Sequence, residues 1–180
     1  MSQSDVSAHD GVLERTPTGG FIRFERRYPH PIEEVWDAIT NPARLADWWV
    51  PFEADITLDL RPGGKMVMAG RGDDAPTMVW EVLAVDPPRL LEHTHADEGS
   101  RMRWELEPAG EGCVLRVSHH VPDPAVAIER NYLVGLHTSL SALGPTLDGR
   151  RASWDREEFE RLRVRYAARG LGLADPAGGR

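Results

Sequence analysis

The stretch from Pro124 to Gly149 constrains the fold more than any other part of the chain. Leucines recur there at steps of three, four, three and four residues: Leu133, Leu136, Leu140, Leu143 and Leu147. This spacing places them on one face of a helix. Pro124 suits the start of that helix, and Asp148-Gly149 suits its end. Gly144-Pro145 is expected to kink or stop the last turn, because Pro145 has no N–H to donate.

The apolar face of this helix requires a partner within the chain. No further heptads follow, so a coiled coil is excluded, and the strand-like segments before the helix are the best candidates. Small residues lie beside the leucines, namely Gly135, Ser139 and Ala142, and they leave room next to the helix. The sequence therefore predicts a long helix held in a curved sheet, with a space between the two.

The strand-like segments are separated by short turns. Phe21–Tyr28 and Arg101–Glu107 alternate between apolar and polar residues, and further strands are expected at 12–16, 53–60, 65–69, 78–85, 90–95 and 113–119. Short connections between them predict an antiparallel meander. Two short helices are expected after residue 30, the second with Asn41 as its cap and Pro42 at its first position. A trailing helix is expected to begin at Ser153.

Composition and charge exclude several classes of protein. The net charge is −8, the wrong sign for a protein that binds a phosphate backbone, so nucleic acid is not expected as a partner. The single cysteine, Cys113, cannot form an internal disulfide. No segment reaches the ~20 apolar residues of a membrane span, and no signal peptide is recognised, so a cytoplasmic location is expected. We expect residues 1–10 to be disordered, 11–168 to form one domain and 169–180 to be a flexible tail.

Several short phrases, in this order, resemble one known group of proteins. They are PIEEVWDAITNP at 31–42, LADWW at 45–49, RPGG at 61–64, VDPP at 85–88, LEPAG at 106–110 and GLHTSL at 135–140. Together with Trp154 and Tyr166 in the trailing segment, they are similar to the START/Bet v 1-like (SRPBCC) superfamily, and within it to the Hsp90-ATPase-activator-homologue (AHSA1-like) branch. The resemblance covers roughly residues 11–168.

This resemblance implies an α+β helix-grip fold. In that fold a curved antiparallel sheet of about seven strands surrounds a long C-terminal helix, with two short helices after the first strand and one extra trailing helix. It also implies a cavity between sheet and helix, which the superfamily uses for lipids, polyketides and sterols. The leading expectation is binding of a small apolar molecule without a cofactor. One alternative is a cyclase- or hydrolase-like enzyme. The other is a protein-interaction or stress-response module without a ligand, either a partner binder or a homodimer through the exposed edge strand.

Aromatic, methionine and leucine side chains are the expected lining of the cavity, since they suit an adaptable apolar ligand. The predicted ligand-binding residues are Trp48, Trp49, Met66, Met68, His93, His95, Trp104, His119, Tyr132, Leu136 and Leu140. The alternative is that these side chains simply fill the core between sheet and helix.

Histidines are the most unusual feature of the predicted sheet. Period-two alternation places His93 and His95 on one face, and His119 on the same face of the last strand, with His137 opposite them on the helix. Three interpretations remain open: polar residues at a hydrated mouth, a general base with a pKa near neutrality, or a zinc site, which needs three or four converging ligands. No phosphate-binding glycine loop or nucleophile elbow is present, so a conventional catalytic motif is lacking.

Overall fold

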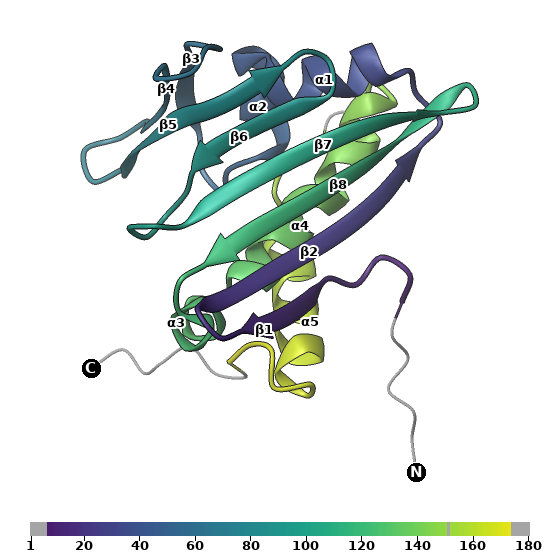
Figure 1. The fold of residues 1–180 in the computed structure, drawn as a ribbon. Helices are drawn as coiled ribbons and strands as arrows, with labels where there is room; N and C mark the ends of the chain where they lie inside the picture. The colour runs from purple at the N-terminus through teal and green to yellow at the C-terminus, as the bar shows by residue number, and fades with distance from the viewer. Residues whose placement is uncertain (1–6, 151, 174–180) are drawn as a thin grey trace.

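The computed structural model describes residues 7–150 and 152–173. Its strands form one antiparallel sheet in the order β1-β2-β8-β7-β6-β5-β4-β3 (Figure 1). Their bounds are Val12–Thr16 (β1), Gly19–Tyr28 (β2), Ala54–Leu58 (β3), Lys65–Gly70 (β4), Thr77–Asp86 (β5), Leu90–Thr94 (β6), Arg101–Ala109 (β7) and Gly112–Val121 (β8). Every pair is sequential except β2–β8, which joins the first hairpin to the end of the meander.

The helices complete the expected α+β helix-grip fold. They are α1 (Ile32–Thr40), α2 (Pro42–Trp48), α3 (Pro124–Glu129), α4 (Tyr132–Leu147) and α5 (Arg156–Ala167). The sheet has 8 strands, whereas the family resemblance implied about seven. The strand expected at 12–16 from the residue pattern is present and pairs with β2 as an edge strand. The two short helices consequently follow the second strand. None of the helices in the described ranges is long and apolar enough to cross a bilayer.

The helix predicted over residues 124–149 is broken in two. Asn131, between α3 and α4, has a φ of 55°, a left-handed conformation that a continuous α-helix does not contain. Its side-chain oxygen accepts a hydrogen bond from the Leu173 N–H at 3.2 Å. Pro145 does not end α4, which continues to Leu147. The prediction of one unbroken helix was therefore wrong at Asn131, and the prediction of an early stop was wrong at Pro145.

The leucine face of α4 is buried as predicted. The exposed fractions of Leu133, Leu136, Leu140, Leu143 and Leu147 are 2%, 5%, 2%, 0% and 4%. Figure 1 shows α4 crossing behind the strands, and all five leucines belong to the buried hydrophobic core. Burying an aliphatic side chain of this size stabilises the fold by roughly 1.5–3 kcal/mol, which makes α4 the centre of the core.

Capping side chains fix the starts of the shorter helices. Asn41 accepts a hydrogen bond from the Ala43 N–H at 3.1 Å, and Pro42 occupies the first turn of α2, as predicted. The trailing helix begins later than expected. Its cap is Asp155, which accepts from the Glu157 N–H at 2.8 Å, and Ser153 lies before it.

The ends of the described chain are partly ordered by contacts. The expected disorder of residues 1–6 and 174–180 lies outside the described residues. Within the described part, the Asp10 side chain is completely buried and pairs with Arg165 at 2.8 Å and Arg169 at 3.0 Å. Leu171 packs against the core. Residues 7–10 and 169–173 thus contact the domain that the sequence placed at 11–168.

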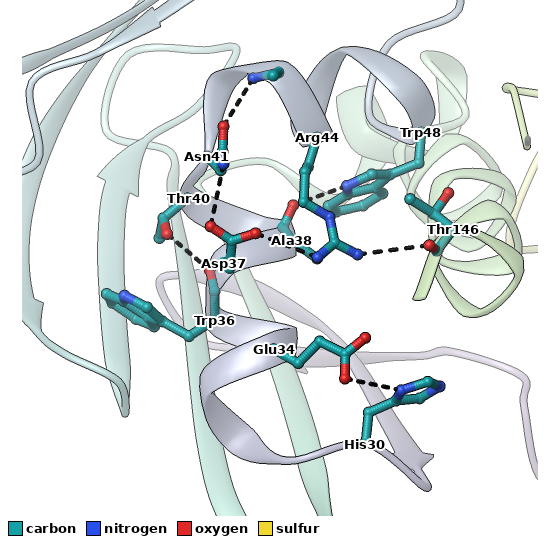
Figure 2. A network of polar contacts seen from close by, with 11 residues as sticks. His30, Glu34, Trp36, Asp37, Ala38, Thr40, Asn41, Arg44, Trp48 and Thr146 are labelled. Atoms are coloured by element: carbon teal, nitrogen blue, oxygen red, sulfur yellow. Dashed lines mark hydrogen bonds and ion pairs between the residues drawn. The ribbon is translucent and has the colours of Figure 1, made fainter. Parts of the chain in front are cut away.

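Polar contacts fasten α1 and α2 to the end of α4 (Figure 2). The Trp48 indole N–H donates to the Ala38 carbonyl at 3.0 Å, which ties α2 to α1. Arg44 reaches the Asp37 carboxylate at 3.2 Å and the Thr146 carbonyl at 3.5 Å. These contacts hold α1, α2 and the C-terminal end of α4 together.

His30 joins the start of α1 to the residue after α4. Its Nε2 lies 3.0 Å from the Asp148 carboxylate, and its Nδ1 lies 3.2 Å from Glu34 (Figure 2 shows the Glu34 contact). The hydrogen bond with Asp148, together with a weaker one from Glu34, raises the pKa of His30 above its ordinary value, although partial burial acts in the opposite direction.

The raised pKa of His30 makes its contribution to stability dependent on pH. The contribution is fully present below the unfolded pKa of about 6.5 and is lost as pH rises through the folded pKa. We therefore expect His30→Asn to destabilise the protein more at pH 5.5 than at pH 8.5, as measured by urea unfolding. Arg71→Gln, which removes the surface pair with Asp55, serves as a control with equal effects at both pH values. Equal effects of His30→Asn would contradict the prediction.

Candidate ligand-binding site

A cavity of about 210 Å³ lies between the sheet and α4. Strands β5, β7 and β8 contribute one wall and α4 contributes another. Residues around α2 and α5 complete the lining, and the cavity is partly open to solvent. The lining residues are Trp49, Val50, Pro51, Met78, Trp80, His95, Met102, His119, Arg130, Asn131, Tyr132, Gly135, Leu136, Ser139, Trp154 and Phe159. The predicted space between sheet and helix is therefore present.

Small residues on α4 create this space. A Cβ atom added to Gly135 would have nothing within 4 Å, although Gly135 lies inside a helix. The Ser139 hydroxyl donates to the Trp49 carbonyl at 3.1 Å, so this polar atom is already paired. Ala142, the third small residue, lies on another face of α4 beside Pro145 and does not line the cavity.

Aromatic rings form most of the apolar wall. Trp49 contacts Trp48, Trp80 and Trp104 edge-on, with centroids 5.3, 6.2 and 5.1 Å apart. Edge-to-face pairs at these distances are favourable beyond the area they bury. The wall is consequently rigid on the sheet side, and Trp49 and Trp80 are its members that reach the cavity.

His93 supports this wall and is not free to bind. Its Nδ1–H donates to the Thr94 carbonyl at 2.7 Å, and its Nε2 accepts from the Trp104 indole N–H at 3.1 Å. Its ring also stacks on Trp80 at 5.4 Å. Both nitrogens are therefore engaged, which fixes the neutral tautomer and holds Trp104 in place.

Only one of the two ring nitrogens of His119 has a hydrogen-bond partner in the described chain. Its Nε2 lies 2.7 Å from the Ser100 hydroxyl, which also donates to the His120 carbonyl at 3.1 Å. A hydroxyl has one hydrogen, so both contacts form together only when His119 carries its own hydrogen on Nε2. The Nδ1 atom of His119 is then an acceptor, and it is buried without a hydrogen-bond partner among the described residues.

His95 lies against His119 with its ring edge-on at 4.8 Å, and against Trp80 at 4.4 Å. Its Nδ1 is also buried and unpaired within the described chain. The predicted gathering of His93, His95 and His119 therefore occurs, but with different roles. Across residues 7–150 and 152–173, no group of three or more His, Cys, Asp or Glu side chains is placed to hold a metal ion.

Burial keeps these imidazoles neutral. It lowers the pKa of His93 to about 4, and, with a smaller contribution from His93, it lowers the pKa of His119 to about 3. The pKa of His95 falls well below its ordinary value, first through burial and then through its two histidine neighbours. At neutral pH the site presents uncharged hydrogen-bonding nitrogens.

A polar cluster stands beside the histidines. The Tyr132 hydroxyl donates to Asp97 at 2.7 Å, and Arg130 also pairs with Asp97. The Tyr132 ring lies 5.5 Å from that of His119. Tyr132 thus connects the cavity wall to a charged pair on partly exposed residues.

The structure separates the predicted ligand-binding residues into two sets. Those lining the cavity are Trp49, His95, His119, Tyr132 and Leu136, whereas Trp48, Met66, Met68, His93, Trp104 and Leu140 are buried outside its lining. His137 does not face the other histidines. Its Nδ1 bonds to the Tyr166 hydroxyl at 2.8 Å, on another side of α4.

Several lining residues were not predicted. Trp80 and Met78 lie two residues apart on β5. The residue between them is Val79, which is apolar but exposed, so the sequence pattern did not show which face of the strand is inward. Trp154 and Phe159 come from the segment after α4 and pack on each other at 5.1 Å. Nothing in their local sequence pattern indicates that they reach back to a cavity formed by earlier strands.

The buried histidines make stability fall in acid. Their folded pKa values are depressed, so stability is fully present above about pH 6.5 and is lost as pH falls toward the folded values. Each such histidine contributes a slope of about 1.4 kcal/mol per pH unit. We expect His119→Leu to reduce the slope of unfolding free energy between pH 6.5 and 5 by about that amount, measured by urea titration. His30→Asn should leave this slope nearly unchanged, because the contribution of His30 is already fully present below about pH 6.5. An unchanged slope in His119→Leu would refute the neutral state of His119.

Comparisons with known proteins agree with the geometry. The sequence model described as Activator of Hsp90 ATPase homolog 1-like protein matches residues 29–147. The crystal structure of CalU16 from Micromonospora echinospora is 26% identical, with 88% of this chain and 94% of that one covered and a TM-score of 0.65. Protein CV1439 from Chromobacterium violaceum is 25% identical, with 74% and 99% covered and a TM-score of 0.56.

A third solved structure shows the same fold at lower identity. EF2215 from Enterococcus faecalis, titled a conserved protein of unknown function, is 16% identical, with 92% of this chain and 94% of that one covered and a TM-score of 0.73. No curated protein matches the chain. Since the family model spans most of the sheet, both short helices and all of α4, the chain belongs to the Activator of Hsp90 ATPase homolog 1-like protein family.

Proposed function

We propose that the protein binds a small, largely apolar molecule in the cavity between the sheet and α4. The observation that carries this proposal is the open space beside Gly135, inside a helix whose other inward residues are buried. A partly open pocket of about 210 Å³ walled by aromatic side chains has the concave, mostly apolar character of small-molecule sites.

The volume indicates the size of the ligand. Cavities for drug-sized molecules measure about 300–1,000 Å³, and this one is smaller. One or two fused rings, or a short branched chain, fit such a space. Trp49, Trp80 and Phe159 offer ring faces and edges against which an aromatic ligand can pack.

The histidines indicate one polar group on the ligand. The Nδ1 atoms of His95 and His119 are buried and unpaired, and an unpaired buried polar atom costs about 1–3 kcal/mol. His119 Nδ1 is an acceptor, so a ligand hydroxyl is its natural partner. Because the surrounding imidazoles are neutral, a neutral hydroxyl suits the site better than an anion.

Catalysis in the same cavity is the second candidate. The pairing of Tyr132 with Asp97 near His119 provides polar groups of the kind that a cyclase- or hydrolase-like enzyme uses. General-base catalysis is most efficient when the pKa of the base lies near the operating pH. With a pKa of about 3 for His119, binding is favoured over proton abstraction.

An interaction module is supported less well by the surface. In the described part of the chain, the exposed large hydrophobic side chains are Val12, Val79 and Val164, which lie on β1, β5 and α5. Isolated apolar residues of this kind are ordinary on protein surfaces. A homodimer through an edge strand, a cytoplasmic location and a stress-response role stay predictions.

Filling the space beside Gly135 tests the binding function directly. We expect Gly135→Leu to fold with unchanged or higher stability, because a helical glycine with open space around it gains about 0.5–1 kcal/mol from a helix-forming residue. The same variant should lose binding of 1-naphthol at least tenfold, measured through the fluorescence of the cavity tryptophans. Gly144→Ala, on the same helix but outside this cavity, is the matched control and should bind normally. Naphthol binding that survives Gly135→Leu would place the ligand elsewhere.

Comparing 1-naphthol with naphthalene tests the role of His119. We expect the wild-type protein to bind 1-naphthol several-fold more tightly, since only the hydroxyl can donate to the Nδ1 atom. His119→Leu should abolish this preference while retaining naphthalene binding, because the Ser100 hydroxyl keeps its bond to the His120 carbonyl. An undiminished preference in His119→Leu would show that the hydroxyl is recognised by another group.

A further inference from the structure

A second cavity, of about 250 Å³, lies on a different face of α4. The α4 residues that line it are His137, Leu140, Ser141 and Gly144, at helical positions i, i+3, i+4 and i+7. The ligand-binding cavity described above uses Tyr132, Gly135, Leu136 and Ser139 instead. Strand β2 forms the facing wall through Arg26 and Tyr28.

Arg26 points into the core because of the alternation of β2. Ile22, Phe24 and Tyr28 share its face and are buried, and only 6% of Arg26 itself is exposed. Its Nη1 donates to the Glu25 carbonyl at 3.0 Å, and the guanidinium lies 5.1 Å from the Phe24 ring centroid. Its Nη2 is buried with no hydrogen-bond partner among the described residues.

No carboxylate in the described chain pairs with Arg26. The carboxylate whose charge acts on it is Asp10. The Oδ2 atom of Asp10 bonds to Arg165 and Arg169, and its Oδ1 atom is buried without a hydrogen-bond partner in the described chain. A buried charge without a hydrogen-bonded partner is destabilising. Because Asp10 makes no hydrogen bond with Arg26 and also pairs with two other arginines, it balances the charge of Arg26 only in part.

Two further donors accompany the unpaired guanidinium. The Tyr28 hydroxyl is buried and has no partner in the described chain, and burial raises its pKa, so it keeps its hydrogen. The Tyr166 hydroxyl accepts from the Gly11 N–H at 2.7 Å, and its oxygen lies 2.8 Å from His137 Nδ1. When Tyr166 gives its hydrogen to Nδ1, His137 carries its own hydrogen on Nε2, and this N–H is a donor without a hydrogen-bond contact in the described chain.

We propose that this second cavity binds a small carboxylate, with Arg26 as its counterion and Tyr28 and His137 as hydrogen-bond donors. One unpaired guanidinium balances one negative charge, whereas a phosphate dianion would leave a buried surplus. The planar guanidinium also matches the two oxygens of a carboxylate. Leu140 and the Tyr28 ring supply apolar surface for a short hydrocarbon tail.

Thermal unfolding in sodium butanoate tests the site, with sodium chloride of equal ionic strength as the reference. We expect the midpoint for the wild-type protein to rise saturably with butanoate at pH 7, by about 5 °C or more at a hundredfold excess over the dissociation constant. Arg26→Met should show no rise. Without butanoate, it should be at least as stable as the wild-type protein, because an apolar side chain replaces an unpaired buried charge.

Matched variants distinguish a loss of butanoate binding from a general change in stability. Arg23→Met alters the same strand on its solvent face, where Arg23 pairs with Glu14, and should keep the full response. Tyr28→Phe, a near-isosteric change, should fold and weaken the response several-fold. Gly135→Leu should keep it, since that substitution fills only the other cavity, so the failure of one proposal can be told from the failure of the other.

Three results would overturn the proposal. The first is no saturable response of the wild-type protein to butanoate. The second is an equal response in Arg26→Met, or in Tyr28→Phe if Arg26→Met does not fold. The third is stabilisation by phosphate at equal ionic strength without stabilisation by butanoate, which would assign the cavity to a different anion.

Discussion

The packing of α4 across the inner face of the sheet is the constraint on which the structure depends. A helix buried on nearly all sides needs large apolar side chains on its inward face, and Leu143 and Leu147 are among those buried there. Where the side chains of α4 are small or missing, as at Gly135, a gap is left beside the helix. The sheet cannot move in to fill this gap, because hydrogen bonds between the strands hold them in place. The cavity follows from a rigid sheet meeting a helix of uneven width.

The histidines show how burial decides the chemistry of this space. An imidazolium ion in such surroundings would need a nearby carboxylate, and His93, His95 and His119 have none in hydrogen-bond contact within the described chain. Burial instead keeps each imidazole from taking up a second proton, and the neutral rings act as hydrogen-bond donors and acceptors. Hydrogen bonds to Thr94 and Ser100 then fix which nitrogen carries the hydrogen in two of the three rings. His30, which lies between two carboxylates, shows the opposite outcome in the same molecule.

Sequence periodicity predicted most of the fold because it follows directly from local geometry. The leucine spacing, the alternation of β7 and the cap at Asn41 each depend on neighbours along the chain. The break at Asn131 could not be predicted in this way, because a left-handed residue there is held by a contact with Leu173. Similarly, period-two alternation placed His93, His95 and His119 on one face. Which ring nitrogens remain without a partner depends on the hydrogen bonds with Trp104 and Ser100, and these are tertiary contacts. Trp154 and Phe159 reach the cavity through tertiary packing alone.

The segments on either side of the region matched by the family model contribute to both cavities. Arg26 and Tyr28 precede residue 29, whereas Trp154, Phe159 and Tyr166 follow residue 147. The first segment supplies the proposed counterion site of one cavity, and the second supplies part of the wall of the other. Substitutions in these two segments can therefore change either cavity without altering a residue between 29 and 147.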